Sequence, residues 1–296
     1  MSTDGDSTDG DSTGRDGTGG DGTGGRLDDL LVALDVDGTI VDHDEVLTDR
    51  VREAVQRLAK AGAHVVVATG RSLHATLPIA QRLGLDAGYD GSYLVCSNGA
   101  VTVRLDSSLE PGYQVVAVHT FDPTSVVAVL HEHLPTGLFA VEVLGRGYKL
   151  TASFPDGELL GEMEVVPFEE LFTEPVMRVV VRSPDHTSAE FMALVDQVGL
   201  HGVAYSVGWT AWLDLAPDGV TKASALEDVR LRLELAPAAT VAVGDGRNDL
   251  EMLRWAARGV AMGNAPQEVM DAADEVTGTV ADDGLADVID SLLDRG

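Results

Sequence analysis

The stretch LVALDVDGTIVD, residues 31–42, joins a short apolar run to two aspartates that are one residue apart. A continuous apolar run of this length is typical of a strand that is covered on both faces of a sheet. Asp35 and Asp37 would then stand together at the carboxyl end of that strand, where like charges repel and isolated buried carboxylates are costly. Either the pair lies at the surface, or a positive group occupies the gap between the two side chains.

The sequence on either side of this stretch alternates between predicted strands and helices. Residues 48–62 predict a helix that ends at Gly62, because apolar residues recur on one helical stripe. That stripe consists of Val51, Ala54, Val55, Leu58 and Ala59. The runs 64–70, 93–100, 240–245 and 259–263 predict further strands, with helices between the last two and after them. This β-α-β alternation predicts an α/β fold, with a Rossmann-like doubly wound parallel sheet at its core.

The middle of the chain has a different pattern. Between residues 102 and 216, five predicted strands surround two predicted helices, at 122–134 and 187–199. We therefore expect an inserted α+β domain at 102–216 that interrupts a core made of 27–101 and 217–296. Residues 1–26 are rich in Asp, Gly, Ser and Thr and are expected to form a disordered acidic tail.

The composition limits the possible partners and locations. The net charge is −29, of which residues 1–25 contribute −5, so the body of the chain is acidic as well. Such a surface repels phosphate backbones, and we expect no nucleic-acid partner. The sequence has no apolar run long enough for a membrane helix and no apolar signal segment, so a cytoplasmic protein without a membrane partner is expected. The single cysteine, Cys96, is interpreted as a small core residue.

Polar signatures follow four of the predicted strands. They are DVDGT (35–39), ATGR (68–71), SNGA (97–100) and GDGRND (244–249), and DGVTK ends in Lys222 ahead of the last part of the chain. In an open parallel sheet, the carboxyl ends of the strands meet at one edge. Carboxylates, a hydroxyl and a lysine gathered there suit a phosphate group and a hard divalent cation such as Mg²⁺. A cation between Asp35 and Asp245 would explain why the aspartates tolerate one another.

These ordered signatures resemble those of the haloacid dehalogenase-like (HAD) hydrolases, and more specifically the Cof-type sugar phosphatases. The resemblance extends from about Leu30 to the C-terminus and includes SNGA and AMGNA (261–265). It departs from the subgroup at Ala223, where glycine is usual after the lysine. The inserted domain would then act as a cap over the active site.

The resemblance implies a catalytic role for four residues. Asp35 would attack phosphorus and form an aspartyl-phosphate, while Asp37 would protonate the leaving alcohol and then activate water. Thr69 would donate a hydrogen bond to the phosphoryl group, and Lys222 would neutralise its charge.

The same resemblance implies a metal site and a substrate site. Mg²⁺ would be held by Asp35, the backbone carbonyl of Asp37, and Asp245, with Asn248 and Asp249 just outside. The expected substrate contacts are Thr69, Gly70, Arg71, Asn98, Lys222 and Asn248.

The predicted partner is a small-molecule phosphate ester, bound by a monomer or a homodimer. In the cap, His119, Arg146, Lys149 and Arg178 are candidate contacts for a sugar or a second anion, but we expect most of them to be ordinary surface residues. Residues 145–149 form the candidate substrate loop. The first functional hypothesis is a Mg²⁺-dependent phosphatase acting on small phosphorylated metabolites, with sugar phosphates as the expected class. The alternatives are a phosphomutase or phosphoryl transferase, and a non-catalytic metabolite-binding regulator.

Overall fold

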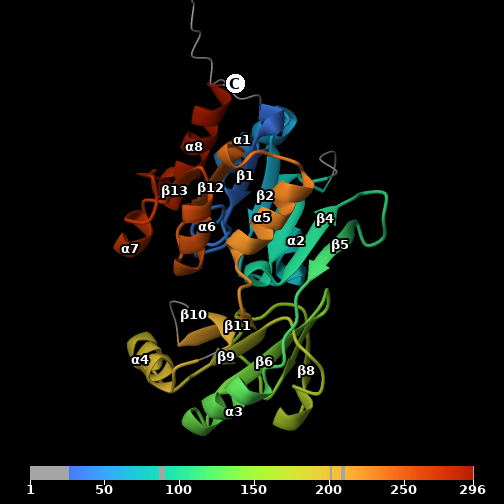
Figure 1. Cartoon of the computed structure of the whole chain (residues 1–296), viewed down its shortest axis with the longest axis vertical. Coiled ribbons are helices and arrows are strands. Elements are labelled where there is room, and N and C mark those ends of the chain that lie inside the picture. The colour runs from blue at the N-terminus through green and yellow to red at the C-terminus, as the bar shows by residue number, and fades with distance from the viewer. Residues whose placement is uncertain (1–26, 87–90, 201, 208–210, 296) are drawn as a thin grey trace, which may run out of the picture.

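The computed structural model describes residues 27–86, 91–200, 202–207 and 211–295. The predicted acidic tail, residues 1–26, lies outside the described residues. The described chain forms two β-sheets with their own helices, one above the other in Figure 1. The chain crosses from the first unit into the second and returns, so the expected α/β core interrupted by an insertion is confirmed.

The first sheet has eight strands in the order β14-β13-β12-β1-β2-β3-β4-β5. Its first six strands are parallel, and β4 and β5 extend it in antiparallel fashion. The strands are β1 (Leu31–Leu34), β2 (His64–Ala68), β3 (Tyr93–Cys96), β4 (Val101–Leu105), β5 (Tyr113–Val118), β12 (Thr240–Gly244), β13 (Arg258–Ala261) and β14 (Glu275–Val276).

Helices cover both faces of this sheet. One face packs against α1 (Asp49–Lys60), α2 (Leu73–Leu83) and α8 (Gly284–Leu293). The other face packs against α5 (Lys222–Arg232), α6 (Leu250–Trp255) and α7 (Gln267–Met270). The alternation of side chains along β1 divides it between the two faces, with Val32 and Leu34 in the first core and Leu31 and Ala33 in the second. This explains why the strand is apolar at every position.

Helix α1 follows its sequence signals closely. The Thr48 side chain accepts a hydrogen bond from the Val51 backbone amide and caps the first turn. The predicted stripe is buried at four of its five positions, and Ala59 is half-buried against the same core. Gly62, with φ +101°, lies just beyond the helix in a conformation that favours glycine. Helices α2 and α8, by contrast, were not among the predicted elements.

The second sheet has six strands in the order β10-β11-β9-β6-β7-β8. They are β6 (Leu138–Val143), β7 (Gly147–Leu150), β8 (Glu162–Val165), β9 (Val179–Arg182), β10 (Val203–Val207) and β11 (Trp212–Pro217). Helices α3 (Thr124–His133) and α4 (Ser188–Val198) share an apolar core with one face of β6, β9 and β11. The opposite face of this sheet is turned toward the first sheet (Figure 1). We call residues 119–216 the cap.

The start of the insertion differs from the expected boundary at residue 102. Strands β4 and β5 lie within the range expected for the insertion, yet they pair with β3 and with each other in the first sheet. The physical reason is the tight turn at Ser97–Gly99, where three successive residues have positive φ, because it folds β4 back against β3. Separate packing of the cap begins only after Val118.

No helix among the described residues is both long enough and apolar enough to cross a membrane.

Cys96 gives a direct test of core packing. Its side chain is fully buried at the end of β3, and burial raises the pKa of the thiol to about 12. At pH 8 only on the order of one thiol in ten thousand would be ionised. We expect no reaction of the native protein with a thiol-specific chromogenic reagent, and one equivalent of reaction after denaturation. Rapid labelling of the native protein would contradict the predicted burial.

Candidate active site

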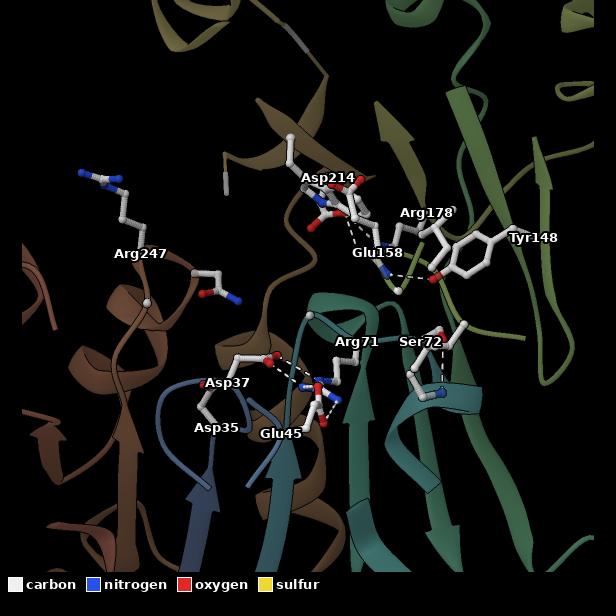
Figure 2. Close-up of a pocket in the computed structure, with 18 of the residues that line it drawn as sticks. Asp35, Asp37, Glu45, Arg71, Ser72, Tyr148, Glu158, Arg178, Asp214 and Arg247 are labelled. Atoms are coloured by element: carbon white, nitrogen blue, oxygen red, sulfur yellow. Dashed lines mark hydrogen bonds and ion pairs between the residues drawn. The ribbon is translucent and has the colours of Figure 1, made fainter. Parts of the chain in front are cut away.

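Five strands of the first sheet deliver polar side chains to one edge. Asp35 and Asp37 follow β1, Thr69 follows β2, Asn98 follows β3, and Asp245 follows β12. Asn264 comes from the loop after β13. Because the parallel strands all end at this edge, residues far apart in sequence meet there, beneath the cap (Figure 2).

Lys222 lies at the centre of the site. It is the first residue of α5, and the Thr221 side chain caps that helix by accepting from the Ser224 amide. Lys222 Nζ donates to Asp35 Oδ1 at 2.6 Å and to Asp249 Oδ1 at 2.7 Å. The ammonium group is fully buried. One buried cation therefore holds two carboxylates that come from opposite ends of the sequence.

Asp249 is fixed on its other side as well. Its Oδ2 accepts from the backbone amides of Asp245, at 3.0 Å, and Gly246, at 2.8 Å. A Cβ at Gly244 would lie 2.6 Å from that same oxygen, so the close approach requires glycine at this position. Asp249 thus orients both the Lys222 ammonium group and the turn that carries Asp245.

Asn264 connects three loops around Asp245. Its Nδ2 donates to Asp245 Oδ2 at 2.9 Å and to the Gly38 carbonyl at 3.0 Å. Its Oδ1 accepts from the Val280 amide at 2.8 Å. These contacts fix the loop after β13 and orient the Asp245 carboxylate.

Negative charge exceeds positive charge in this cluster. Burial, and next the charge of Asp249, raise the pKa of Asp35 well above its usual range, although Lys222 opposes the shift. Burial likewise raises the pKa of Asp245 to about 7, with Asp249 adding to the shift. Burial alone would lower the pKa of Lys222, but the charges of Asp249 and Asp35 outweigh it and raise that pKa. One lysine is therefore too little charge for three carboxylates.

The donor set fits a hard divalent cation. Carboxylate oxygens of Asp35, Asp245 and Asp249 lie within 4.8 Å of one another, and all three residues are buried. Both Asp249 oxygens already accept hydrogen bonds, so Asp35 and Asp245 are the carboxylates best placed to face an ion. Mg²⁺ prefers such oxygen ligands together with water and a phosphate oxygen.

Asp37 points away from this cluster and into the cavity. Arg71 donates to both of its oxygens, from Nε at 3.0 Å and from Nη2 at 2.5 Å. The same guanidinium donates to Glu45 from Nη1 at 3.1 Å and from Nη2 at 2.5 Å. Asp37 remains well exposed, with a side-chain exposure of 62%, so its carboxylate is accessible from the cavity (Figure 2).

The other predicted contacts divide into two groups. Gly70, Arg71 and Asn248 line the cavity. Thr69 is fully buried, and its Oγ1 accepts from the Arg71 backbone amide at 3.1 Å. Asn98 accepts from Asn248 Nδ2 at 3.0 Å and lines a neighbouring cavity together with Lys222. The structure brings all of these residues to the same strand ends.

The cavity lies between the strand ends and the cap and has a volume of about 380 Å³. The cap contributes seven residues to its wall: Tyr148, Glu158, Leu159, Leu160, Arg178, Trp212 and Asp214, besides the backbone of Gly157. A space of this size suits a small molecule. The phosphate-binding end and the opposite wall therefore come from different parts of the fold.

A buried contact joins the cap to the first sheet beside the cavity. Ser97 Oγ, from the SNGA turn, donates to Glu142 Oε2 of β6 at 2.6 Å. Both side chains are buried. Glu142 also lies 3.8 Å from the Arg178 guanidinium, so this contact fixes the cap wall relative to the strand ends.

The structure keeps most of the basic cap residues out of the cavity, as expected, but it corrects the predicted substrate loop at 145–149. Of the four basic residues proposed as contacts, only Arg178 lines the cavity. Arg146 is 70% exposed and pairs with Glu162, and the 145–149 segment contributes only Tyr148. The cavity residues Glu45, Ser72, Glu158, Trp212 and Asp214 were missed. The available signal was a polar residue at alternate positions of an otherwise apolar strand, as in WLDLA (212–216).

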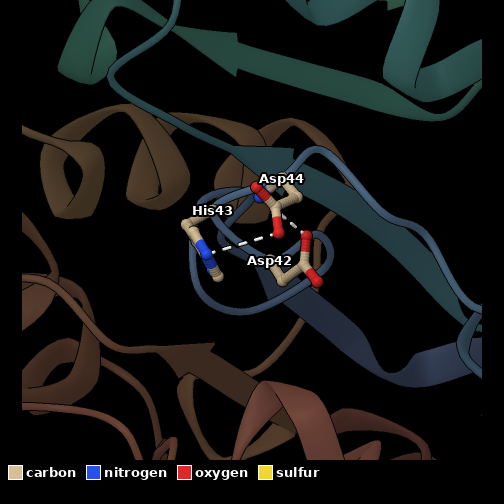
Figure 3. A group of neighbouring side chains, drawn as sticks. All are labelled: Asp42, His43 and Asp44. Carbon is tan, nitrogen blue, oxygen red and sulfur yellow. Dashed lines mark hydrogen bonds and ion pairs between the residues drawn. The ribbon is translucent and has the colours of Figure 1, made fainter.

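A second acidic group lies on the surface in the loop after Val41. Asp42, His43 and Asp44 gather there (Figure 3). Asp42 Oδ1 accepts from the backbone amides of Asp44 and Val46, each at 2.9 Å. The loop geometry accounts for the cluster, and all three side chains are open to solvent at least in part.

Several known proteins are similar to this chain over most of its length. Residues 32–137 and 160–289 match the model of a family described as haloacid dehalogenase-like hydrolase. The putative phosphatase YkrA of Bacillus subtilis is 28% identical over 281 residues, which cover 90% of this chain and 98% of the relative. A phosphoglycolate phosphatase of Natronomonas pharaonis is 28% identical over 268 residues, covering 89% and 98%. A solved haloacid dehalogenase-like hydrolase from Bacteroides thetaiotaomicron is 25% identical, with a TM-score of 0.72 and coverage of 89% and 99%.

Gly38 allows a test of the cation site. A Cβ at this position would lie 2.1 Å from Asp245 Oδ2, and the residue has φ +76°. We expect Gly38→Ala to weaken Mg²⁺ binding at least about tenfold, measured by calorimetric titration, because the methyl group displaces the Asp245 carboxylate.

Gly112→Ala is the matched control. Gly112 has φ +93°, but its Cβ would meet nothing within 4 Å. Both variants should lose stability through the backbone conformation, by about 1 kcal/mol. Only Gly38→Ala should lose Mg²⁺ affinity, and equal affinity in the two variants would contradict the assigned site.

Proposed function

Because the chain belongs to the haloacid dehalogenase-like hydrolase family, we propose that it is a Mg²⁺-dependent phosphatase of small phosphorylated metabolites, with sugar phosphates as the substrate class. The observation that carries the proposal is the buried Lys222 ammonium group bonded to Asp35 and Asp249. It lies behind a small cavity that Asp35 and Asp245 line. The relatives named as phosphatases support the reaction class.

In the first half-reaction, the Asp35 carboxylate attacks phosphorus. A bond forms between an Asp35 oxygen and phosphorus while the ester P–O bond breaks, and the leaving oxygen takes a proton from Asp37. In the second half-reaction, water attacks phosphorus and gives its proton to Asp37. The aspartyl-phosphate P–O bond breaks, inorganic phosphate leaves, and the Asp35 carboxylate is restored.

The surrounding residues support these steps. Lys222 holds Asp35 in place and offsets negative charge that gathers around phosphorus. Arg71 holds the Asp37 carboxylate on the cavity side, where a leaving group would stand. Mg²⁺, held by Asp35, the Asp37 carbonyl and Asp245, would supply the positive charge that lets a phosphate dianion approach these carboxylates. The cap would exclude bulk water from the reacting groups.

Replacing the nucleophile tests the covalent step. We expect Asp35→Asn to lower kcat by at least about 10⁴-fold, because an amide is a poor nucleophile toward phosphorus. Phosphate release from glucose 6-phosphate measures the loss, and circular dichroism checks that the fold is kept. The control Asp185→Asn alters an exposed cap carboxylate that bonds Thr136, and it should keep wild-type turnover. Substantial activity in Asp35→Asn would reject the nucleophile.

Metal removal tests the cofactor. With EDTA present, phosphate release should stop, because the excess charge of the three carboxylates would repel the substrate. Excess Mg²⁺ should restore the rate. Turnover that continues after the protein has been dialysed against EDTA would show that the metal is not required.

A further inference from the structure

The cap wall of the cavity carries more negative than positive charge. Its charged lining residues are Glu158, Asp214 and Arg178. They face the strand ends across the cavity in Figure 2, opposite Asp37 and Arg71. If the phosphoryl group binds at the strand ends, as the proposed function requires, the leaving group must lie against this wall.

Arg178, the only cation of this wall among the described residues, is already paired. Its Nε and Nη2 both donate to Asp214 Oδ1, at 2.8 and 2.6 Å. Its Nη1 donates to the Tyr148 hydroxyl at 3.3 Å and lies 3.8 Å from Glu142. The Arg178 side chain is only 6% exposed. A guanidinium that is buried and matched by carboxylates is poorly available to an anionic ligand.

The strands of the cap place these groups on one face. Along β6, β9 and β11, apolar residues point to the helix side. Glu142 and Asp214 alternate with them in β6 and β11, and Arg178 directly precedes β9. Adjacent strands then bring the three side chains together. The pairing of Arg178 is therefore built into the sheet, and a bound ligand would have to break it in order to use the charge.

Glu158 adds an acceptor to the same wall. Its Oε1 accepts from Arg182 Nε at 3.2 Å. Its Oε2 is a buried oxygen with no hydrogen-bond donor among the residues that the structure describes. A buried carboxylate oxygen without a donor favours a ligand that supplies one, such as a hydroxyl group.

Aromatic surface completes the wall. Trp212 and Tyr148 line the cavity, and Trp212 packs edge-on against Phe154, with ring centroids 6.1 Å apart. Such rings offer apolar area beside the polar acceptors.

Glu142, Tyr148 and Glu158 also lie between the two ranges that match the family model, whereas Asp35, Asp245 and Lys222 lie inside them.

From these contacts we infer that the cap selects leaving groups that are uncharged and bear hydroxyl groups, and that it discriminates against leaving groups with a carboxylate or a second phosphate. The inference rests on the proposed phosphatase function. Asp214 is the residue that sets the selection, because it occupies the guanidinium that could otherwise bind an anion. Such a preference for uncharged leaving groups would distinguish this chain from a relative that is named for phosphoglycolate, a substrate with a carboxylate.

Two substrates that differ mainly in one charge test the inference. Glucose 6-phosphate has an uncharged leaving group, and 6-phosphogluconate has a leaving group of similar size that carries a carboxylate. We expect kcat/KM of the wild-type enzyme with Mg²⁺ to be at least about tenfold higher for glucose 6-phosphate. The smaller pair 2-hydroxyethyl phosphate and phosphoglycolate should show the same order.

The variant Asp214→Asn should reduce this preference at least about tenfold, because it leaves the Arg178 charge without its closest partner. The control Asp185→Asn should leave the ratio unchanged, since Asp185 is exposed on the cap and bonds Thr136. Glu158→Gln gives a second variant on the same wall, which should also shift the ratio toward the anion. If Asp214→Asn does not fold, the wild-type ratio of kcat/KM for the uncharged and the carboxylate-bearing substrates tests the selection.

The outcomes separate this inference from the function on which it rests. Equal or faster turnover of the carboxylate-bearing substrates by the wild-type enzyme overturns the selection while leaving the phosphatase function intact. An unchanged ratio in folded Asp214→Asn overturns the role of Asp214. Absence of phosphate release from all four esters by folded, Mg²⁺-loaded enzyme overturns both the inference and the proposed function for these classes.

Discussion

The central constraint in this protein is the crowding of Asp35, Asp245 and Asp249 around one buried lysine. Three carboxylates with oxygens within 4.8 Å of one another cannot be balanced by Lys222 alone. The imbalance raises the pKa of both Asp35 and Asp245. A divalent cation would restore the balance, and the phosphoryl group of a substrate would then meet a surface that attracts it.

The fold makes this crowding possible by its topology. Strands β1 and β12 are adjacent and parallel, so Asp35 and Asp245 emerge side by side although 210 positions separate them. Helix α5 begins at Lys222, where the chain returns from the cap, and thereby aims the ammonium group at both acids. Asn264 and the turn at Gly38 hold Asp245 from the other side. The crossing between the two units is therefore also the point at which the site is assembled.

Sequence alone predicted much of this arrangement because the strand ends carry short polar signatures. The continuous apolar runs indicated buried parallel strands, and the rule that such strands end at one edge brought Asp35, Asp37, Thr69 and Asp245 together. The resemblance to the HAD hydrolases, which the family model confirms, added roles that spacing could not supply. The helix at Asp49–Lys60 was equally predictable, since its stripe and its cap are both local.

The rest depended on long-range pairing that no local pattern records. Strands β4 and β5 join the first sheet only because the Ser97–Gly99 turn reverses the chain, so the insertion begins later than expected. In the cap, the sequence offered Arg178 as a candidate contact for a sugar or a second anion. Only the register of β6, β9 and β11 shows that Glu142 and Asp214 surround it. Basic residues such as Arg146 were proposed as substrate contacts because of their charge, but Arg146 is exposed. Alternate residues of apolar strands contribute to the cavity wall instead.

Locating the cation is the most direct test of the proposed Mg²⁺ site between Asp35 and Asp245. Crystals of the full chain soaked in Mn²⁺, which shares the oxygen-rich geometry of Mg²⁺, can be measured for anomalous scattering. We expect a peak about 2.1 Å from carboxylate oxygens of both Asp35 and Asp245. A fully soaked crystal with no peak between those two side chains, or with Mn²⁺ bound only at the exposed Asp42–Asp44 loop, would contradict it.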